Sequence, residues 1–202
     1  MLVTIEFCAV ISSAIYGILL ACRKELDVVG VFAIAFTISF GGGTLRDVFL
    51  DRHPLFWIAN DHYVVIVLVL SISGAILPRL VARLEKFLLV PDALGLALFS
   101  ITGAGYALEG GTSLLIASMM AVLTGTFGGV IADVIINEIP RLFRSAPLYA
   151  ICAFTGTWVY LILQQFNLPA SIPIISGFAA IFLLRMAAVR WDIRLPNAKL
   201  DG

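Results

Sequence analysis

Three consecutive glycines end a long apolar run and stand directly before a pair of opposite charges. Residues 39–47 read Ser-Phe-Gly-Gly-Gly-Thr-Leu-Arg-Asp, and the apolar run from Val28 to Phe40 leads into them. Each glycine weakens a helix by about 1 kcal/mol relative to alanine. A backbone group freed inside a membrane finds no water unless it faces protein or a wet cavity. We therefore predict a broken transmembrane helix, the kind of element that holds the solute in many transporters.

A second copy of this pattern lies 86 residues further along the chain. Gly42-Gly43 corresponds to Gly128-Gly129, and Asp47 corresponds to Asp133. The other landmarks that coincide at this offset are Gly17 with Gly103, Pro54 with Pro140, Tyr63 with Tyr149, and Glu6 with Asp92. Six coincidences at one offset predict an internal duplication. The second copy would carry the same helix break as the first.

The two predicted breaks define the residues that could contact a solute. A broken helix presents free carbonyl groups at one half and free N–H groups at the other, and carbonyls can replace the water around a monovalent cation. The candidate kink and pore residues are Gly41, Gly42, Gly43, Gly125, Gly128 and Gly129. The hydroxyl groups expected to extend a polar path belong to Ser39, Thr44, Thr124 and Thr126. The alternative is that the glycines only allow close helix packing.

Charged residues next to the glycines are candidates for gating. Arg46, Asp47 and Asp133 belong to this group. A carboxylate inside a membrane must be paired or hydrated. Since adjacent residues on a helix do not face one another, we expect each aspartate to pair with a different span, or else to lie at the interface as a mouth residue. Ala132 occupies the position that matches Arg46, so the two copies differ in charge.

Three further charges lie near the ends of apolar runs. Glu6 and Asp92 are expected to stabilise the first turns of their helices through the helix dipole; a cation vestibule is the alternative. Arg185 lies about one turn inside the last apolar run, and we expect its side chain to extend to the cytoplasmic surface.

The elements that position these residues are membrane spans. The chain has 202 residues, of which 61% are hydrophobic and only 13% charged, and its mean hydropathy is +1.05. Soluble proteins contain about 45–50% apolar and 25% charged residues, so the fold class is an all-α polytopic membrane protein. A span needs about 20 mostly apolar residues. The seven predicted spans are 4–22, 28–50, 62–78, 92–109, 112–136, 147–164 and 172–189.

These spans form a single membrane domain over residues 1–202 with no soluble part. Repeat one covers about 4–78, repeat two covers about 92–164, and 172–189 is an extra helix. Each repeat has three spans, an odd number, so the second repeat must enter the membrane upside down. Inverted repeats with paired broken helices are typical of transport proteins.

The distribution of Lys and Arg predicts the orientation of the chain. Ten of the 13 lie in loops on one side, which the positive-inside rule assigns to the cytoplasm. They are Arg23, Lys24, Arg79, Arg83, Lys86, Arg141, Arg144, Arg190, Arg194 and Lys199. We therefore expect a multi-pass protein of the cell (inner) membrane with its N-terminus outside and its C-terminus in the cytoplasm.

Several functional classes have no support in the sequence. The formal net charge is zero, so no attraction to nucleic acid is implied. We find no nucleophile with its base, no phosphate-binding loop and no metal quartet, which argues against an enzyme, a cofactor, a metal site and a transport ATPase.

The paired motifs also carry a resemblance. Gly41-Gly42-Gly43-Thr44-Leu45-Arg46-Asp47 and Gly128-Gly129-Val130-Ile131-Ala132-Asp133-Val134 are similar to the prokaryotic branch of the TRIC (trimeric intracellular cation) channel family, some members of which have been labelled glycine transporters. The resemblance implies a seven-span protomer built from two inverted three-helix repeats. It also implies a homotrimer in the lipid bilayer with a pore in each subunit that conducts potassium and sodium. Glycine-kinked second and fifth helices would line that pore.

The residues leave three functions open. The first is a passive monovalent cation channel between spans 1, 2, 4 and 5. The second is a small-solute carrier, for example for glycine, in which half-helix N-termini bind the carboxylate and free carbonyls bind the ammonium group. The third is a membrane scaffold that transports nothing.

Overall fold

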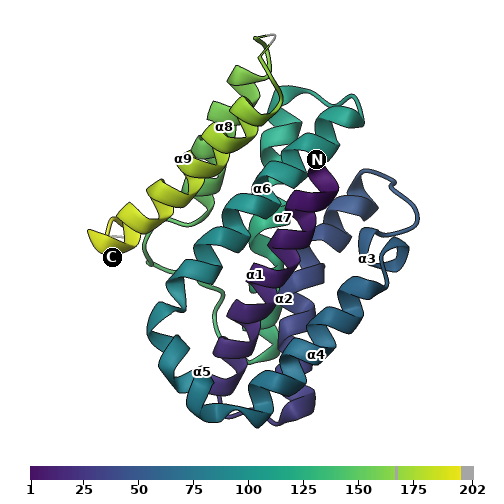
Figure 1. Ribbon diagram of the computed structural model, residues 1–202. Coiled ribbons are helices and arrows are strands. Elements are labelled where there is room, and N and C mark those ends of the chain that lie inside the picture. The colour runs from purple at the N-terminus through teal and green to yellow at the C-terminus, as the bar shows by residue number, and fades with distance from the viewer. Residues whose placement is uncertain (167, 197–202) are drawn as a thin grey trace, which may run out of the picture.

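The computed structural model describes residues 1–166 and 168–196, and in this part of the chain the regular elements are helices (Figure 1). Lys199, counted above in the cytoplasmic tail, lies outside the described residues. The elements are α1 (Leu2–Arg23), α2 (Val28–Phe49), α3 (Phe56–Ala59), α4 (His62–Ile76), α5 (Pro78–Leu84), the 3-10 helix η1 (Glu85–Phe87), α6 (Leu89–Glu109), α7 (Leu114–Ile135), α8 (Ala150–Leu163) and α9 (Ser171–Arg190). Across the described residues no strand forms, and a single β-bridge joins Pro147 to Arg194.

The turns that precede α2 and α7 have the same kind of side-chain cap and backbone conformation at positions 86 residues apart. Asp27 caps α2 by accepting a hydrogen bond from the Gly30 N–H, and Ser113 caps α7 by accepting one from the Ile116 N–H. Such caps pair backbone donors that a helix start leaves free. The turn ahead of each cap contains a residue with positive φ, Glu25 at 56° and Gly111 at 75°.

The ends of α2 and α7 also correspond. Asp51 follows α2 with φ 52°, and Asn137 follows α7 with φ 59°. The Asp47 carbonyl accepts from the Arg52 N–H at 2.8 Å, and the Asp133 carbonyl accepts from the Glu138 N–H at 2.8 Å. Each of these pairs is again separated by 86 positions.

The predicted helix breaks are wrong. Helix α2 runs without interruption through Gly41, Gly42 and Gly43, and α7 runs through Gly125, Gly128 and Gly129. The physical reason is that a freed backbone group has no water partner in lipid, so opening the helix costs more than the roughly 1 kcal/mol that each glycine subtracts.

Five described helices are long and apolar enough to cross a membrane, namely α1, α2, α6, α7 and α9. Helix α4 passes the same test only together with the segment Pro78–Phe87, from which it is bent by 99°. Helix α8 is apolar but has only 14 residues. The expected spans 62–78 and 147–164 are therefore shorter as helices than the sequence suggested.

The helices pack in two groups joined at their centre. One apolar cluster is built mainly from α1, α2 and α4, and the other from α6, α7, α8 and α9. Helix α7 lies against both α2 and α6, and α1 lies against α6. Helices α8 and α9 run side by side along one edge of the molecule (Figure 1). The crossing of α2 with α7 thus lies between the groups, and it brings both glycine motifs together.

Candidate transport site

The two glycine motifs meet where α2 crosses α7. A Cβ atom added to Gly42 would lie 2.2 Å from the Thr124 carbonyl oxygen, and one added to Gly128 would lie 2.4 Å from the Ile38 carbonyl oxygen. Both glycines therefore touch backbone that no side chain could approach as closely. Residues 38 and 124 are themselves 86 positions apart, so the crossing is symmetric. The structure gives Gly42 and Gly128 the packing role that was the alternative interpretation.

The remaining glycines differ between the two motifs. A Cβ on Gly43 would lie 2.4 Å from the Phe56 ring, whereas a Cβ on its counterpart Gly129 would have nothing within 4 Å. Gly41 faces Gly128 across the crossing, and Gly125 packs against α6. Gly129 is thus the member of the predicted pore set that faces open space, and Phe56 fills the equivalent space beside Gly43.

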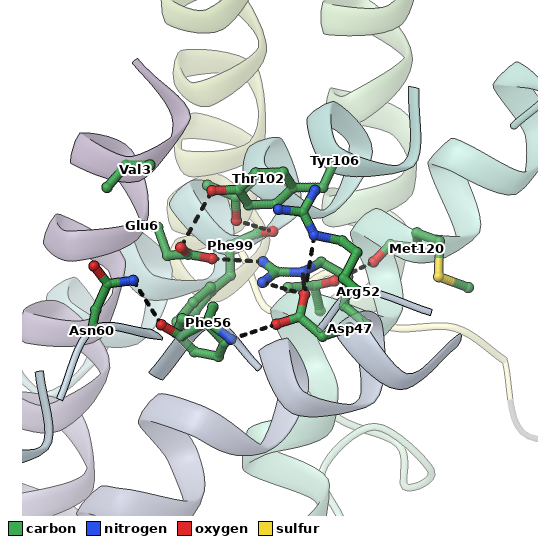
Figure 2. A network of polar contacts seen from close by, with 12 residues as sticks. Val3, Glu6, Asp47, Arg52, Phe56, Asn60, Phe99, Thr102, Tyr106 and Met120 are labelled. Carbon is green, nitrogen blue, oxygen red and sulfur yellow. Dashed lines mark hydrogen bonds and ion pairs between the residues drawn. The ribbon is translucent and has the colours of Figure 1, made fainter. Parts of the chain in front are cut away.

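A buried ion-pair network lies beyond Gly43 (Figure 2). We call it the Arg46 cluster; it consists of Glu6, Arg46, Asp47, Arg52 and Tyr106. The Arg46 side chain is fully buried. Its Nη1 donates to Glu6 Oε1 at 2.8 Å, and its Nε donates to Asp47 Oδ1 at 2.9 Å. The expectation that Asp47 pairs with another span is wrong, because the long arginine side chain bends back to its neighbour while also reaching α1.

The other contacts of the Arg46 cluster fix its carboxylates. Asp47 Oδ2 accepts from the Phe56 N–H at 2.8 Å, and the Tyr106 hydroxyl donates to Glu6 Oε2 at 3.3 Å. The Arg52 guanidinium lies 3.6 Å from Asp47 Oδ1 and 3.8 Å from the centre of the Tyr106 ring. Glu6 therefore serves an ion pair, and the expectation that it stabilises the first helical turn is wrong, since α1 begins at Leu2.

A second network lies at the other end of the α2–α7 crossing. We call it the Asp92 cluster; it consists of Asp92, Asp133, Arg141, Tyr149 and Arg185. Arg185 Nη2 lies 3.1 Å from Asp92 Oδ2, and Nη1 donates to the carbonyls of Pro147 and Leu148 at 3.0 and 2.9 Å. The Tyr149 hydroxyl donates to Asp92 Oδ1 at 3.2 Å. Arg185 is only 7% exposed, so the prediction that it extends to the surface is wrong.

Asp133 is held from the loop that follows its own helix. Its Oδ2 accepts from the Arg141 N–H at 3.0 Å and lies 3.5 Å from Arg141 Nε. This resembles the contact of Asp47 with the Phe56 N–H, and it likewise replaces the expected pairing with another span. Arg185 forms an ion pair with Asp92, as Arg46 forms one with Glu6.

Two small hollows lead from the Asp92 cluster towards the crossing. The outer of the two, of about 80 Å³, is lined by Thr126, Gly129, Asp133, Arg141, Tyr149 and Arg185 among others. The inner, of about 20 Å³, shares Gly129 and Tyr149 with it and reaches Thr124, Gly125, Gly128 and Tyr16. A volume of 20 Å³ is enough for a single water molecule. The buried Tyr16 hydroxyl has no hydrogen-bond partner among the described residues, which gives this hollow one free polar group.

The four hydroxyl residues predicted to line the path also differ between the two motifs. Thr124 and Thr126 line the hollows, and their hydroxyls donate to carbonyls of their own helix at 2.6 and 2.8 Å. Ser39 donates to the Val10 carbonyl at 3.3 Å, and Thr44 accepts from Trp57 Nε1 at 3.0 Å. Neither Ser39 nor Thr44 lines these hollows. Within the described residues no group of three or more His, Cys, Asp or Glu is placed to bind a metal.

Sequence reasoning gave no site role to Arg52, Phe56, Tyr106, Arg141 and Tyr149, and it missed Arg185 as a buried ion-pair partner. One signal existed for the last of these. Ala132 leaves the second copy without the cation that Arg46 supplies to the first, and Arg185 is a lone charge within a later apolar helix.

Comparisons with known proteins identify the family. The family model described as "Glycine transporter" matches this chain twice, over residues 3–79 and 89–165. The UPF0126 inner membrane protein YadS of Escherichia coli K12 is 36% identical over 189 residues, which cover 93% of this chain and 91% of that protein. A UPF0126 membrane protein of Vibrio cholerae is 37% identical over 188 residues, which cover 93% of this chain and 78% of that protein.

Solved structures agree with these matches. A TRIC trimeric intracellular cation channel orthologue from Rhodobacter sphaeroides has a TM-score of 0.86 and 35% identity, covering 95% of this chain and 98% of that one. A structure reported on conductance through TRIC cation channels has a TM-score of 0.89 and 27% identity, covering 98% of both chains. These matched structures are named as channels and not as enzymes. The resemblance of the glycine motifs is thereby confirmed, and the chain is a membrane protein that belongs to the prokaryotic TRIC family, which the glycine transporter model also describes.

Proposed function

We propose that this chain is a monovalent cation channel, permeable to potassium and sodium, with a path through each protomer beside the α2–α7 crossing. The similarity to solved structures of TRIC cation channels supports this function. The observation in the molecule that carries it is the pair of hollows that joins Asp92 and Asp133 to Gly129. Carboxylates at the entrance of a narrow polar path attract cations once their arginine partners move away.

The architecture that we propose is two inverted three-helix repeats, about 4–78 and 92–164, with 172–189 as an extra helix. The two matches of the family model begin 86 residues apart, which is also the spacing of the caps and turns of α2 and α7. We propose a homotrimer in the inner membrane with the N-terminus outside. The name TRIC, for a trimeric channel, and the name of the Escherichia coli relative support these assignments.

In this conformation the path is closed at the Arg46 cluster and hollow at the Asp92 cluster. Phe56 covers Gly43, while the equivalent Gly129 is open. Arg46 is fully buried and bonded to two carboxylates. With the proposed orientation, the open end faces the cytoplasm. Conduction then requires the Phe56 ring and the Arg46 side chain to move.

A carrier of glycine or a similar amino acid is the second candidate. The description of the family model supports it. So does the presence of buried guanidinium and carboxylate groups at each end of the crossing, Arg46 with two carboxylates and Arg185 with Asp92, because a zwitterion needs both charges to be bound. The carrier would use the same hollows.

Reconstituted liposomes separate these functions. We expect potassium flux above that of empty vesicles, and we expect Gly129→Leu to reduce it, since a Cβ at that position meets nothing within 4 Å and the rest of the side chain would occupy the hollow. Val134→Leu is the matched control, because Val134 is 61% exposed on the same helix, and it should leave the flux unchanged. Saturable glycine uptake without potassium current would establish the carrier instead. The absence of both activities would refute both proposals.

A further inference from the structure

The segment Pro78–Phe87, which we call the elbow, leaves α4 at an angle of 99°. A helix that crosses a membrane runs near the bilayer normal, with a tilt of about 20° on average. A segment at a right angle to it therefore lies close to the membrane plane. The elbow follows the end of an apolar helix of 15 residues, which places it at the membrane surface.

The elbow presents three kinds of surface. Pro78, Val81, Ala82 and Glu85 line a hollow of about 410 Å³ that they share with residues of α1, α2 and α4. The large apolar side chains that point outward are Leu80, Leu84 and Phe87, which are 50, 39 and 52% exposed. The basic side chains Arg79, Arg83 and Lys86 are exposed as well. Within each of these two sets, successive residues are separated by four and then three positions. On a helix this spacing places the members of a set on one face, so the apolar set and the basic set form two adjacent stripes.

Adjacent apolar and basic stripes in the membrane plane are typical of a helix that binds a lipid surface. The apolar side chains enter the acyl region, and the basic ones stay at the level of the phosphates. Arg23 is held by Glu85 at 3.4 Å, whereas no salt bridge engages Arg79, Arg83 or Lys86 among the described residues. These three cations are therefore available to an external anion.

The second half of the chain lacks this feature. The residues 86 positions after Pro78–Phe87 are 164–173, and they contain no lysine or arginine. In the proposed inverted arrangement the two segments lie on opposite faces of the membrane. The basic stripe therefore belongs to one leaflet only.

We propose that the elbow is a binding surface for anionic phospholipid in the cytoplasmic leaflet. Arg79, Arg83 and Lys86 contact the headgroup phosphates. One acyl chain lies in the apolar groove of about 280 Å³ that Leu84 and Phe87 form with α1 and with the start of α6. The proposal rests on the placement of this segment at the cytoplasmic face and not on the identity of the transported solute.

Native mass spectrometry of the full chain in detergent tests this proposal with two lipids of identical acyl chains, phosphatidylglycerol and phosphatidylcholine. We expect tighter binding of phosphatidylglycerol. Each basic residue near an anionic surface contributes about a fivefold factor in affinity. The triple variant Arg79→Gln/Arg83→Gln/Lys86→Gln should therefore lower the preference for phosphatidylglycerol by at least tenfold, and Arg79→Lys/Arg83→Lys should retain it.

The matched control removes three cations from the same predicted side of the membrane. Arg144→Gln/Arg190→Gln/Arg194→Gln has the same net charge as the elbow variant and should keep the preference within about twofold. Phe87→Asn should weaken the binding of both lipids equally, because it changes the groove and not the headgroup contacts.

Three results would overturn the proposal. The first is an equal affinity of the wild type for both lipids. The second is an equal loss in the two triple variants, which would indicate a general charge effect. The third is an elbow variant that keeps its lipid preference but loses subunits, which would make the elbow a contact between copies of the chain. A lipid preference that persists when no solute flux is found would support the elbow proposal while refuting the proposed function.

Discussion

Alanine substitutions at two adjacent glycines, Gly128 and Gly129, test the role of close packing at the α2–α7 crossing. A Cβ on Gly128 would lie 2.4 Å from the Ile38 carbonyl oxygen, whereas carbon and oxygen in contact are about 3.3 Å apart. The helices must therefore separate by roughly 0.9 Å. Gly129 has nothing within 4 Å of the same position.

Apart from this contact, we expect the two alanine substitutions to change the free energy of unfolding by the same amount. Both gain about 1 kcal/mol from the higher helix propensity of alanine, so this gain cancels in their difference. Overpacking of a close contact costs about 1–3 kcal/mol. For a chain of this size that corresponds to a difference in Tm of about 2–12 °C, with Gly128→Ala the less stable. Gly129→Ala should equal or exceed the wild type.

Thermal unfolding in detergent, followed by size-exclusion chromatography, measures this difference. Gly42→Ala is a second test, because its Cβ would lie 2.2 Å from the Thr124 carbonyl oxygen, and it should behave like Gly128→Ala. Equal melting temperatures for Gly128→Ala and Gly129→Ala would refute the conclusion that the crossing depends on backbone contact.

Three further predictions concern the two ends of the path. Phe56→Ala should raise potassium flux per protein in liposomes, because it uncovers Gly43, even though truncation of a buried Phe costs about 3–5 kcal/mol. Arg46→Gln should lower stability by about 3–5 kcal/mol in thermal unfolding, because it leaves buried carboxylates unpaired. The hydrogen bond from Lys24 lowers the pKa of the exposed Glu138 carboxyl. The wild type should therefore have a higher Tm than Glu138→Gln at pH 7. This difference in Tm should close as the pH falls below about 4.

For each of these three predictions, a specific result would contradict the reasoning. Unchanged or lower flux in Phe56→Ala, at equal amounts of folded protein, would show that the ring does not block the path. A loss below 1 kcal/mol in Arg46→Gln would mean that water already reaches the cluster. The sign of the pH effect follows from linkage. A carboxyl whose pKa is lower in the folded state than in the unfolded state stabilises the protein at pH values above its ordinary pKa, and this stabilisation is lost in acid. A gap that widens in acid would contradict it.

The membrane class and most helix positions could be predicted from sequence. Long apolar runs are sufficient for α1, α2, α6, α7 and α9, since about 20 apolar residues define a span. The offset of 86 residues between the landmark pairs also separates corresponding turns that the sequence analysis did not single out, such as Asp27 and Ser113 at the helix caps. Local signals of this kind depend only on neighbours in the chain.

The roles of the glycines and charges could not be predicted in the same way. Gly43 and Gly129 correspond at the offset of 86 residues, yet one packs against the Phe56 ring and the other faces a hollow. What differs is the neighbouring helix, which the sequence does not place. The same holds for Arg185, whose partner Asp92 is 93 residues away. The rule that adjacent residues do not pair also failed for Arg46 and Asp47, because it treats side chains as short and straight.

Charge balance explains why the extra helix α9 is part of the site. The Arg46 cluster holds two carboxylates, Glu6 and Asp47, and two guanidinium groups. The Asp92 cluster holds two carboxylates as well, but Ala132 cannot supply the matching cation, and Arg185 of α9 does so instead. A buried carboxylate without a partner is strongly destabilising, so Asp92 depends on Arg185 for its stability. Helix α9 therefore completes the Asp92 cluster, and a movement of α9 away from α6 would free a carboxylate at the entrance of the proposed path.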